Sequence, residues 1–146
     1  LFELIKDSSA SITVGIALSA LKPPKDGDRG DHDVAVYAEL LDDVVTAMLP
    51  KLPTCDSVVI DDGRYGPETL AAIREDIAKL VGPCGTALLE LSHRLSGLQI
   101  ADVIANSFFN RALANERQGR MAAIVAPLLD SGQIKMRVLG GGDAAD

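Results

Sequence analysis

The sequence alternates short apolar runs with longer segments of helical periodicity, and this order constrains the fold more than any other feature. Four runs are expected to be strands, over residues 11–21, 57–62, 86–91 and 134–139. Helices are expected over residues 31–49, 67–81, 96–114 and 119–129. Because the strands are apolar on both faces and are separated by helices, the pattern predicts an α/β fold with a parallel sheet covered on both sides.

Composition sets the size and character of the core. The 146 residues predict one domain over residues 1–139, followed by a glycine-rich tail over residues 140–146. Apolar residues make up 47% of the chain and aromatic residues only 3%, so the core is built from Val, Ile, Leu and Ala. The net charge of −7 argues against a simple electrostatic nucleic-acid binder, but not against a metallonuclease, whose acids hold cations.

Several features predict a cytoplasmic protein. The two cysteines, Cys55 and Cys84, are too few for a disulfide framework, so we expect reduced thiols. The sequence contains no apolar run long enough to span a membrane and no signal peptide. The chain begins at Leu1 within helical sequence, so we expect it to start inside a structural unit that lacks its first strand.

Two acids end the strand expected over residues 57–62. The side chains of Asp61 and Asp62 alternate, so one can face a cleft while the other meets solvent. Carboxylates at the carboxyl end of a strand suit a hard cation such as Mg²⁺ or Mn²⁺. The same Asp-Asp-Gly sequence is also typical of a turn that simply ends a strand.

A third acid, Asp102, lies inside the helix expected to begin near Ser96. Ser96 and Gln99 fit a capping box, with Ser96 as the N-cap. Asp102 is then in the second turn, where the helix dipole contributes little. Because apolar residues cover most of this helix, we expect Asp102 either to pair with a buried donor or to coordinate a metal. His93 and Arg64 are candidate substrate contacts, although loop residues of these types usually have no such role.

Three segments in this order resemble a known family. They are Val36-Tyr37-x2-Leu-Leu, Val58-Val-Ile-Asp-Asp-Gly and Ser92-x3-Ser96-Gly-Leu-Gln-Ile-Ala-Asp102. The chain resembles the carboxyl-terminal two thirds of the family catalogued as domain of unknown function 3800, which is similar in fold to ribonuclease H. The resemblance covers about residues 11–114, and the segment ending at Asp102 is its most specific part.

The resemblance implies a metal-dependent nuclease acting on DNA or RNA. Asp61 and Asp102 would be catalytic, and Asp61, Asp62 and Asp102 would bind Mg²⁺ or Mn²⁺. The family's first strand carries an Asp-Glu-Ser/Thr-Gly motif that supplies another acid, and this sequence has no such motif. We therefore expect a metal-dependent nuclease-like protein, either active or inactive as this chain alone. The alternative is a non-catalytic protein-interaction domain of the same fold. A small-molecule-binding domain is a third alternative. The exposed sheet edge favours a homodimer or a partner chain.

Overall fold

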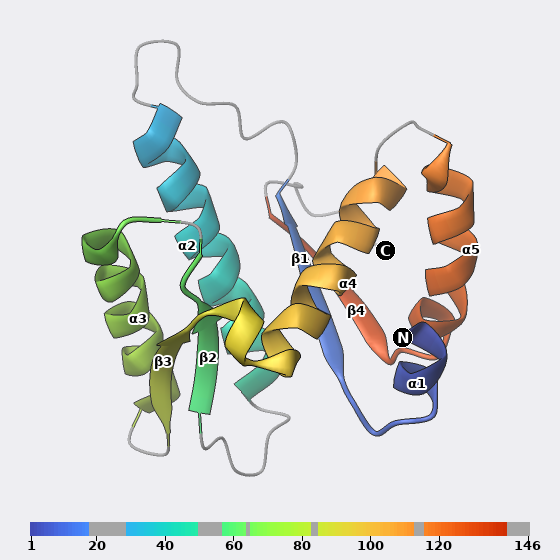
Figure 1. Cartoon of the computed structure of the whole chain (residues 1–146), viewed down its shortest axis with the longest axis horizontal. Coiled ribbons are helices and arrows are strands. Elements are labelled where there is room, and N and C mark those ends of the chain that lie inside the picture. Colours follow the sequence, from blue (N-terminus) through green and yellow to red (C-terminus); the bar gives the residue numbers. More distant parts are fainter. Residues whose placement is uncertain (18–28, 50–56, 64, 83–84, 113–115, 140–146) are drawn as a thin grey trace.

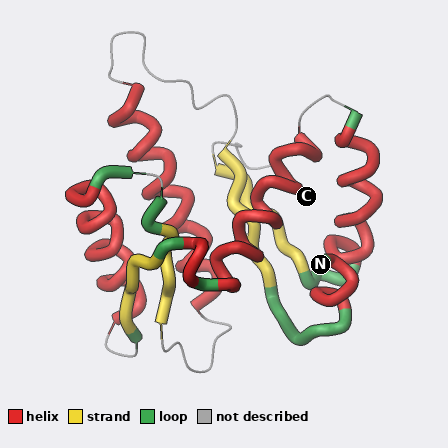
Figure 2. Tube along the Cα trace, in the orientation of Figure 1, coloured by secondary structure: helices red, strands yellow, loops and turns green. Residues whose placement is uncertain are grey.

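Helices and short strands alternate along the described part of the chain (Figures 1 and 2). The computed structural model describes residues 1–17, 29–49, 57–63, 65–82, 85–112 and 116–139. The elements in chain order are α1 (Phe2–Lys6), β1 (Ile12–Ala17), α2 (Arg29–Met48), β2 (Ser57–Asp61), α3 (Pro67–Val81), β3 (Thr86–Glu90), the 3₁₀ turn η3 (Ser92–Arg94), α4 (Ser96–Ala112), α5 (Arg117–Asp130) and β4 (Ile134–Leu139). The mixed α/β class predicted from the sequence is confirmed.

The described strands form two separate parallel pairs. β1 pairs with β4, from Ile12 opposite Ile134 to Ala17 opposite Leu139. β2 pairs with β3, from Ser57 opposite Thr86 to Asp61 opposite Glu90. Parallel pairing is therefore as expected, whereas the expected single sheet is not what the described residues form. Within the described residues, no strand of one pair is hydrogen-bonded to a strand of the other.

Glycine, proline and a backbone carbonyl set the ends of the helices. Gly66 is the N-cap of α3 and Pro67 follows at its first position, where the missing N–H costs nothing. Gly82 ends α3 with a φ of 66°, which suits a residue without a Cβ. The expected N-cap of α4 is wrong by one residue. The first carbonyl oxygen of α4 to accept a helical hydrogen bond is that of Leu95, which accepts the N–H of Gln99 at 3.3 Å. Leu95 is therefore the N-cap, and Ser96 is already helical.

Each strand pair has its own apolar core. The first core joins β1 and β4 to α1, α4 and α5 through Ile5, Val14, Ile104, Phe108, Val125, Leu128 and Ile134. The second joins β2 and β3 to α2 and α3 through Val45, Ile60, Ile73, Ile77, Val81 and Ala87. Most of these residues are Val, Ile or Leu, as the composition predicts.

Helix α2 links the two cores because it also packs on β1. A Cβ built on Gly15 would lie 2.8 Å from Cγ2 of Val44, so α2 approaches this strand as closely as a glycine permits. The neighbouring residue on β4, Arg137, donates from Nε and Nη2 to the carboxylate of Asp43 on α2, at 2.5 and 2.6 Å. This paired hydrogen bond holds the pKa of Asp43 below its ordinary value.

The beginning of the chain is fastened by one side chain that precedes β4. Nε2 of Gln133 donates to the backbone carbonyl oxygens of Ile5, Ser8 and Ala10. Ile5 lies in the first core, where it is 6% exposed. Gln133 therefore holds α1 and the segment after it against the start of β4.

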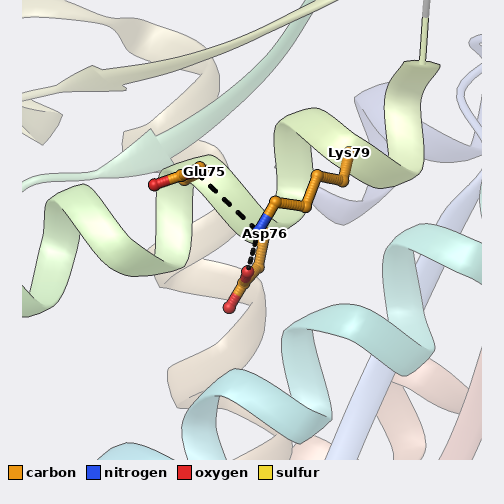
Figure 3. Close-up of polar contacts among 3 residues, drawn as sticks. All are labelled: Glu75, Asp76 and Lys79. Carbon is orange, nitrogen blue, oxygen red and sulfur yellow. Dashed lines mark hydrogen bonds and ion pairs between the residues drawn. The ribbon is translucent and has the colours of Figure 1, made fainter.

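Helix α3 carries a solvent-exposed group of charges on the side that borders α2 (Figure 3). Nζ of Lys79 lies 3.1 Å from Oδ1 of Asp76 and 3.8 Å from Oε1 of Glu75. The hydrogen bond to Asp76 raises the pKa of Lys79. These pairs follow helical spacing on an open surface, so they contribute little stability and indicate no binding site.

Candidate functional site

Asp61 is a half-buried acid at the carboxyl end of β2. Its Oδ1 accepts the backbone N–H of Ser92 at 3.2 Å, which ties the end of β2 to η3. A Cβ built on Gly63 would lie 3.3 Å from Oδ2 of Asp61, so the carboxylate also lies over the turn that follows the strand. These contacts give Asp61 a structural role in the turn and leave Oδ2 beside a residue that has no side chain.

Asp62 and Glu90 lie at the same sheet end as Asp61. The backbone N–H of Asp62 donates to the carbonyl oxygen of Glu90 at 2.9 Å, and the side chain of Asp62 is exposed. Glu90 is the register partner of Asp61, and paired residues of parallel strands share a face of the sheet. Glu90 is not among the site residues predicted from the sequence. An acid that ends an apolar strand was the available signal, the same one that identified Asp61.

Asp102 is exposed on α4, so its expected burial is wrong. Its Oδ1 accepts a hydrogen bond from Nδ2 of Asn106, one turn further along the helix, at 3.2 Å. The physical reason is that the core covers a narrow stripe of α4. Ile104 and Phe108 are buried, whereas Ile100 and Val103 are 42% and 47% exposed. The apolar character of α4 therefore extends beyond its buried side, and Asp102 meets solvent.

The predicted metal ligands are not gathered into one group. Among the described residues, no three His, Cys, Asp or Glu side chains are grouped so that they could hold a metal ion. The three acids predicted as ligands, Asp61, Asp62 and Asp102, therefore do not form such a group. What the arrangement offers at the sheet end is two carboxylates, Asp61 and Glu90, on adjacent strands.

Of the two predicted substrate contacts, His93 is the one that the structure describes. His93 is exposed in η3, between β3 and α4. Arg64, Cys55 and Cys84 lie outside the residues that the structure describes, as does the predicted tail over residues 140–146.

A large apolar cleft lies beside β1. Its volume is about 630 Å³, and its walls come from α1, β1, α2 and α4 with the segment between α1 and β1. Among the described residues, the lining contains no charged side chain, and its polar members are Ser8, Ser11, Thr13 and Tyr37. Leu4 and Ile100 both line the cleft and are 73% and 42% exposed. Pockets of this size and character bind apolar ligands or partner segments.

Comparisons with known proteins place the chain in no group. No family model, curated protein or solved structure matches it. Within the described ranges, none of the helices has the length and apolar character that a membrane span requires.

Proposed function

We propose that this chain is a protein-interaction domain that binds a polypeptide segment in the apolar cleft beside β1. The observation that carries the proposal is the uncharged lining of the cleft in a chain whose net charge is −7. A cleft of about 630 Å³ with an apolar lining is within the size range of sites that bind a ligand or a partner segment. A polypeptide with neutral, apolar side chains is the partner that this lining favours.

The cleft offers positions for a clean test. Ala101 and Ala105 on α4 line the cleft and are exposed, so a larger side chain there projects into the cleft with little effect on the core. Ala123 on α5 is also exposed and does not line the cleft. The same Ala→Arg change at Ala101 and at Ala123 therefore differs mainly in whether it obstructs the cleft.

The experiment is selection from a library of displayed 12-residue random peptides against the wild-type chain, followed by binding of synthetic copies of the selected peptides. We expect peptides rich in Val, Ile, Leu and Thr to be selected. Ala101→Arg should weaken their binding at least about tenfold, because it places an unpaired charge in an apolar site. Ala123→Arg should leave binding unchanged. Failure to select any peptide, or selected peptides that bind Ala101→Arg as well as the wild type, would refute the proposal.

Metal-dependent phosphodiester hydrolysis is the second candidate, and the pairing of Asp61 with Glu90 favours it. Two carboxylates on adjacent strand ends suit Mg²⁺ or Mn²⁺, and such an ion activates water and stabilises charge on a phosphate. The resemblance to the domain of unknown function 3800 family and the ribonuclease H-like arrangement belong to this candidate. DNA or RNA would be the substrate, in the cytoplasm.

This second candidate is tested by cleavage of single- and double-stranded DNA and RNA with Mg²⁺ or Mn²⁺. Asp61→Asn and Glu90→Gln should abolish the cleavage, whereas Asp62→Asn, at an exposed neighbouring carboxylate, should retain it. Asp102→Asn tests the role that the sequence predicts for Asp102. Cleavage that survives both Asp61→Asn and Glu90→Gln would exclude these two carboxylates as the site.

A further inference from the structure

One edge of β1 carries backbone groups that no described strand pairs. The N–H of Ile12 donates to the carbonyl oxygen of Gln133 at 3.0 Å, so the peptide groups of Ile12 face β4. In a parallel ladder, alternate residues direct their N–H and C=O groups to opposite edges. Those of Thr13 and Gly15 therefore face away from β4. Both residues line the cleft, so this edge forms part of the cleft wall.

Helices cover both faces of β1 beside this edge. On one face, Gly15 lies against Val44 of α2. On the other face, Val14 packs in the first core with Ile104 of α4. Residues of both helices also line the cleft, including Leu40 of α2 and Ile100 of α4. The cleft therefore has a strand edge as one wall and a helix on each side, which is the environment of an interior strand in an α/β sheet.

We infer that the occupant of the cleft is an extended strand of another polypeptide that pairs with the outer edge of β1. This inference rests on the proposed interaction function and names the conformation of the partner. Backbone groups of the partner would pair with Thr13 and Gly15, as in other cases of strand addition to an open sheet edge. Because apolar helices flank both faces and the lining is uncharged, the strand carries neutral, apolar side chains on both of its faces.

Other occupants make different use of the same cleft. A helical peptide or an acyl chain would contact the side chains of α2 and α4 without needing the N–H of Thr13. The strand requires that N–H and the space beside it. Thr13→Pro removes the N–H and places a ring at the edge, and it leaves the pairing with β4 intact because the N–H of Thr13 faces away from β4. Thr13→Val keeps the N–H and the branched Cβ, so it is the matched control.

The probe is a capped peptide of eight alternating valines and threonines with two lysines at one end, titrated into the full chain by calorimetry. Its control has proline at alternate positions. We expect the valine–threonine peptide to bind and the proline-containing control not to bind. Thr13→Pro should weaken the binding at least about tenfold, and Thr13→Val should weaken it by less than about twofold. Amide hydrogen exchange should slow at Thr13 and Gly15 when the peptide binds. Circular dichroism of both variants checks that they keep the fold.

The outcomes separate this inference from the proposed function. If the valine–threonine peptide does not bind at millimolar concentration, the inference that an extended strand occupies the cleft is refuted. Binding that Ala101→Arg weakens and Thr13→Pro does not, with no slowing of exchange at Thr13 and Gly15, also overturns it and leaves the cleft as an interaction site of another kind. If every selected or designed peptide binds Ala101→Arg with the same affinity as the wild type, the proposed function itself is refuted.

Discussion

The close approach of α2 to β1 makes Gly15 the most informative single position in the fold. A Cβ at this position would lie 2.8 Å from Cγ2 of Val44 and 3.0 Å from Cγ of Leu40, where carbon atoms in good contact are about 3.5–4.0 Å apart. The Gly15→Ala change therefore forces α2 or its side chains outward. Overpacking of this kind costs about 1–3 kcal/mol.

Part of this cost is offset by the backbone. Gly15 has ordinary strand geometry, and replacing glycine by alanine within a strand restores roughly 0.5–1 kcal/mol. The net expectation, from the middle of these two ranges, is a loss of about 1 kcal/mol in the free energy of unfolding, or roughly 2–4 °C in melting temperature for a chain of this size. Urea unfolding followed by far-ultraviolet circular dichroism measures the loss.

A double-mutant cycle and a second glycine supply the controls. Val44→Ala removes the atom closest to the new Cβ, so adding Gly15→Ala in that background should cost about 1 kcal/mol less than in the wild type. A Cβ built on Gly119 of α5 would have no neighbouring atom within 4 Å, so Gly119→Ala should stabilise the chain by up to about 1 kcal/mol. If Gly15→Ala unfolds at the same urea concentration as the wild type or at a higher one, the packing of α2 on β1 described above is wrong.

Three other changes test the core, the terminus and the pH dependence. Leu70 is 1% exposed, and Leu70→Ala should cost about 2–5 kcal/mol in urea unfolding. Gln133→Met removes the donors to the carbonyl of Ile5 and its neighbours, so limited proteolysis within residues 6–11 should become faster. Arg137 lowers the pKa of Asp43, so this pair stabilises the fold at any pH above the ordinary carboxyl pKa of about 3.9. The contribution is lost as the pH falls through the lower pKa that Asp43 has in the folded state. The difference in urea midpoint between the wild type and Asp43→Asn should therefore be present at pH 7 and shrink below pH 4. A difference that stays constant with pH would contradict the pairing.

Element positions were predictable because their signals are local. The apolar run Ile134–Leu139 and the helix Pro67–Val81 have the bounds that the sequence predicts, since proline, glycine and periodicity act within a few residues. Strand pairing was not predictable in the same way. Nothing within β1 identifies β4, more than a hundred residues away, as its partner, and the apolar pattern of each strand suits any neighbour.

The exposure of Asp102 differs from the burial that the sequence predicts, and the physical reason lies in α4. A helix with apolar residues on most of its sides is expected to be buried on most of its sides. In the structure, Val103 and Phe109 are 47% and 62% exposed, so α4 presents apolar side chains to solvent next to Asp102. The same excess of apolar residues that suggested burial supplies part of the cleft wall through Ile100 and Ala101. The apolar residues on several sides of α4 therefore indicated an exposed apolar surface and not the burial of Asp102.

The cleft and the acidic sheet end share one structural element, and this links the two candidate functions. The first turns of α4 line the cleft, and η3, which immediately precedes α4, is held to the carboxylate of Asp61 through the N–H of Ser92. A partner that displaces α4 also shifts η3, whose Ser92 N–H holds the carboxylate of Asp61. Cleavage measured with and without the valine–threonine peptide tests this link. An interaction domain whose acids have only a structural role shows no cleavage in either state, whereas a nuclease-like domain that needs a partner shows cleavage only with the peptide and loses it in Asp61→Asn.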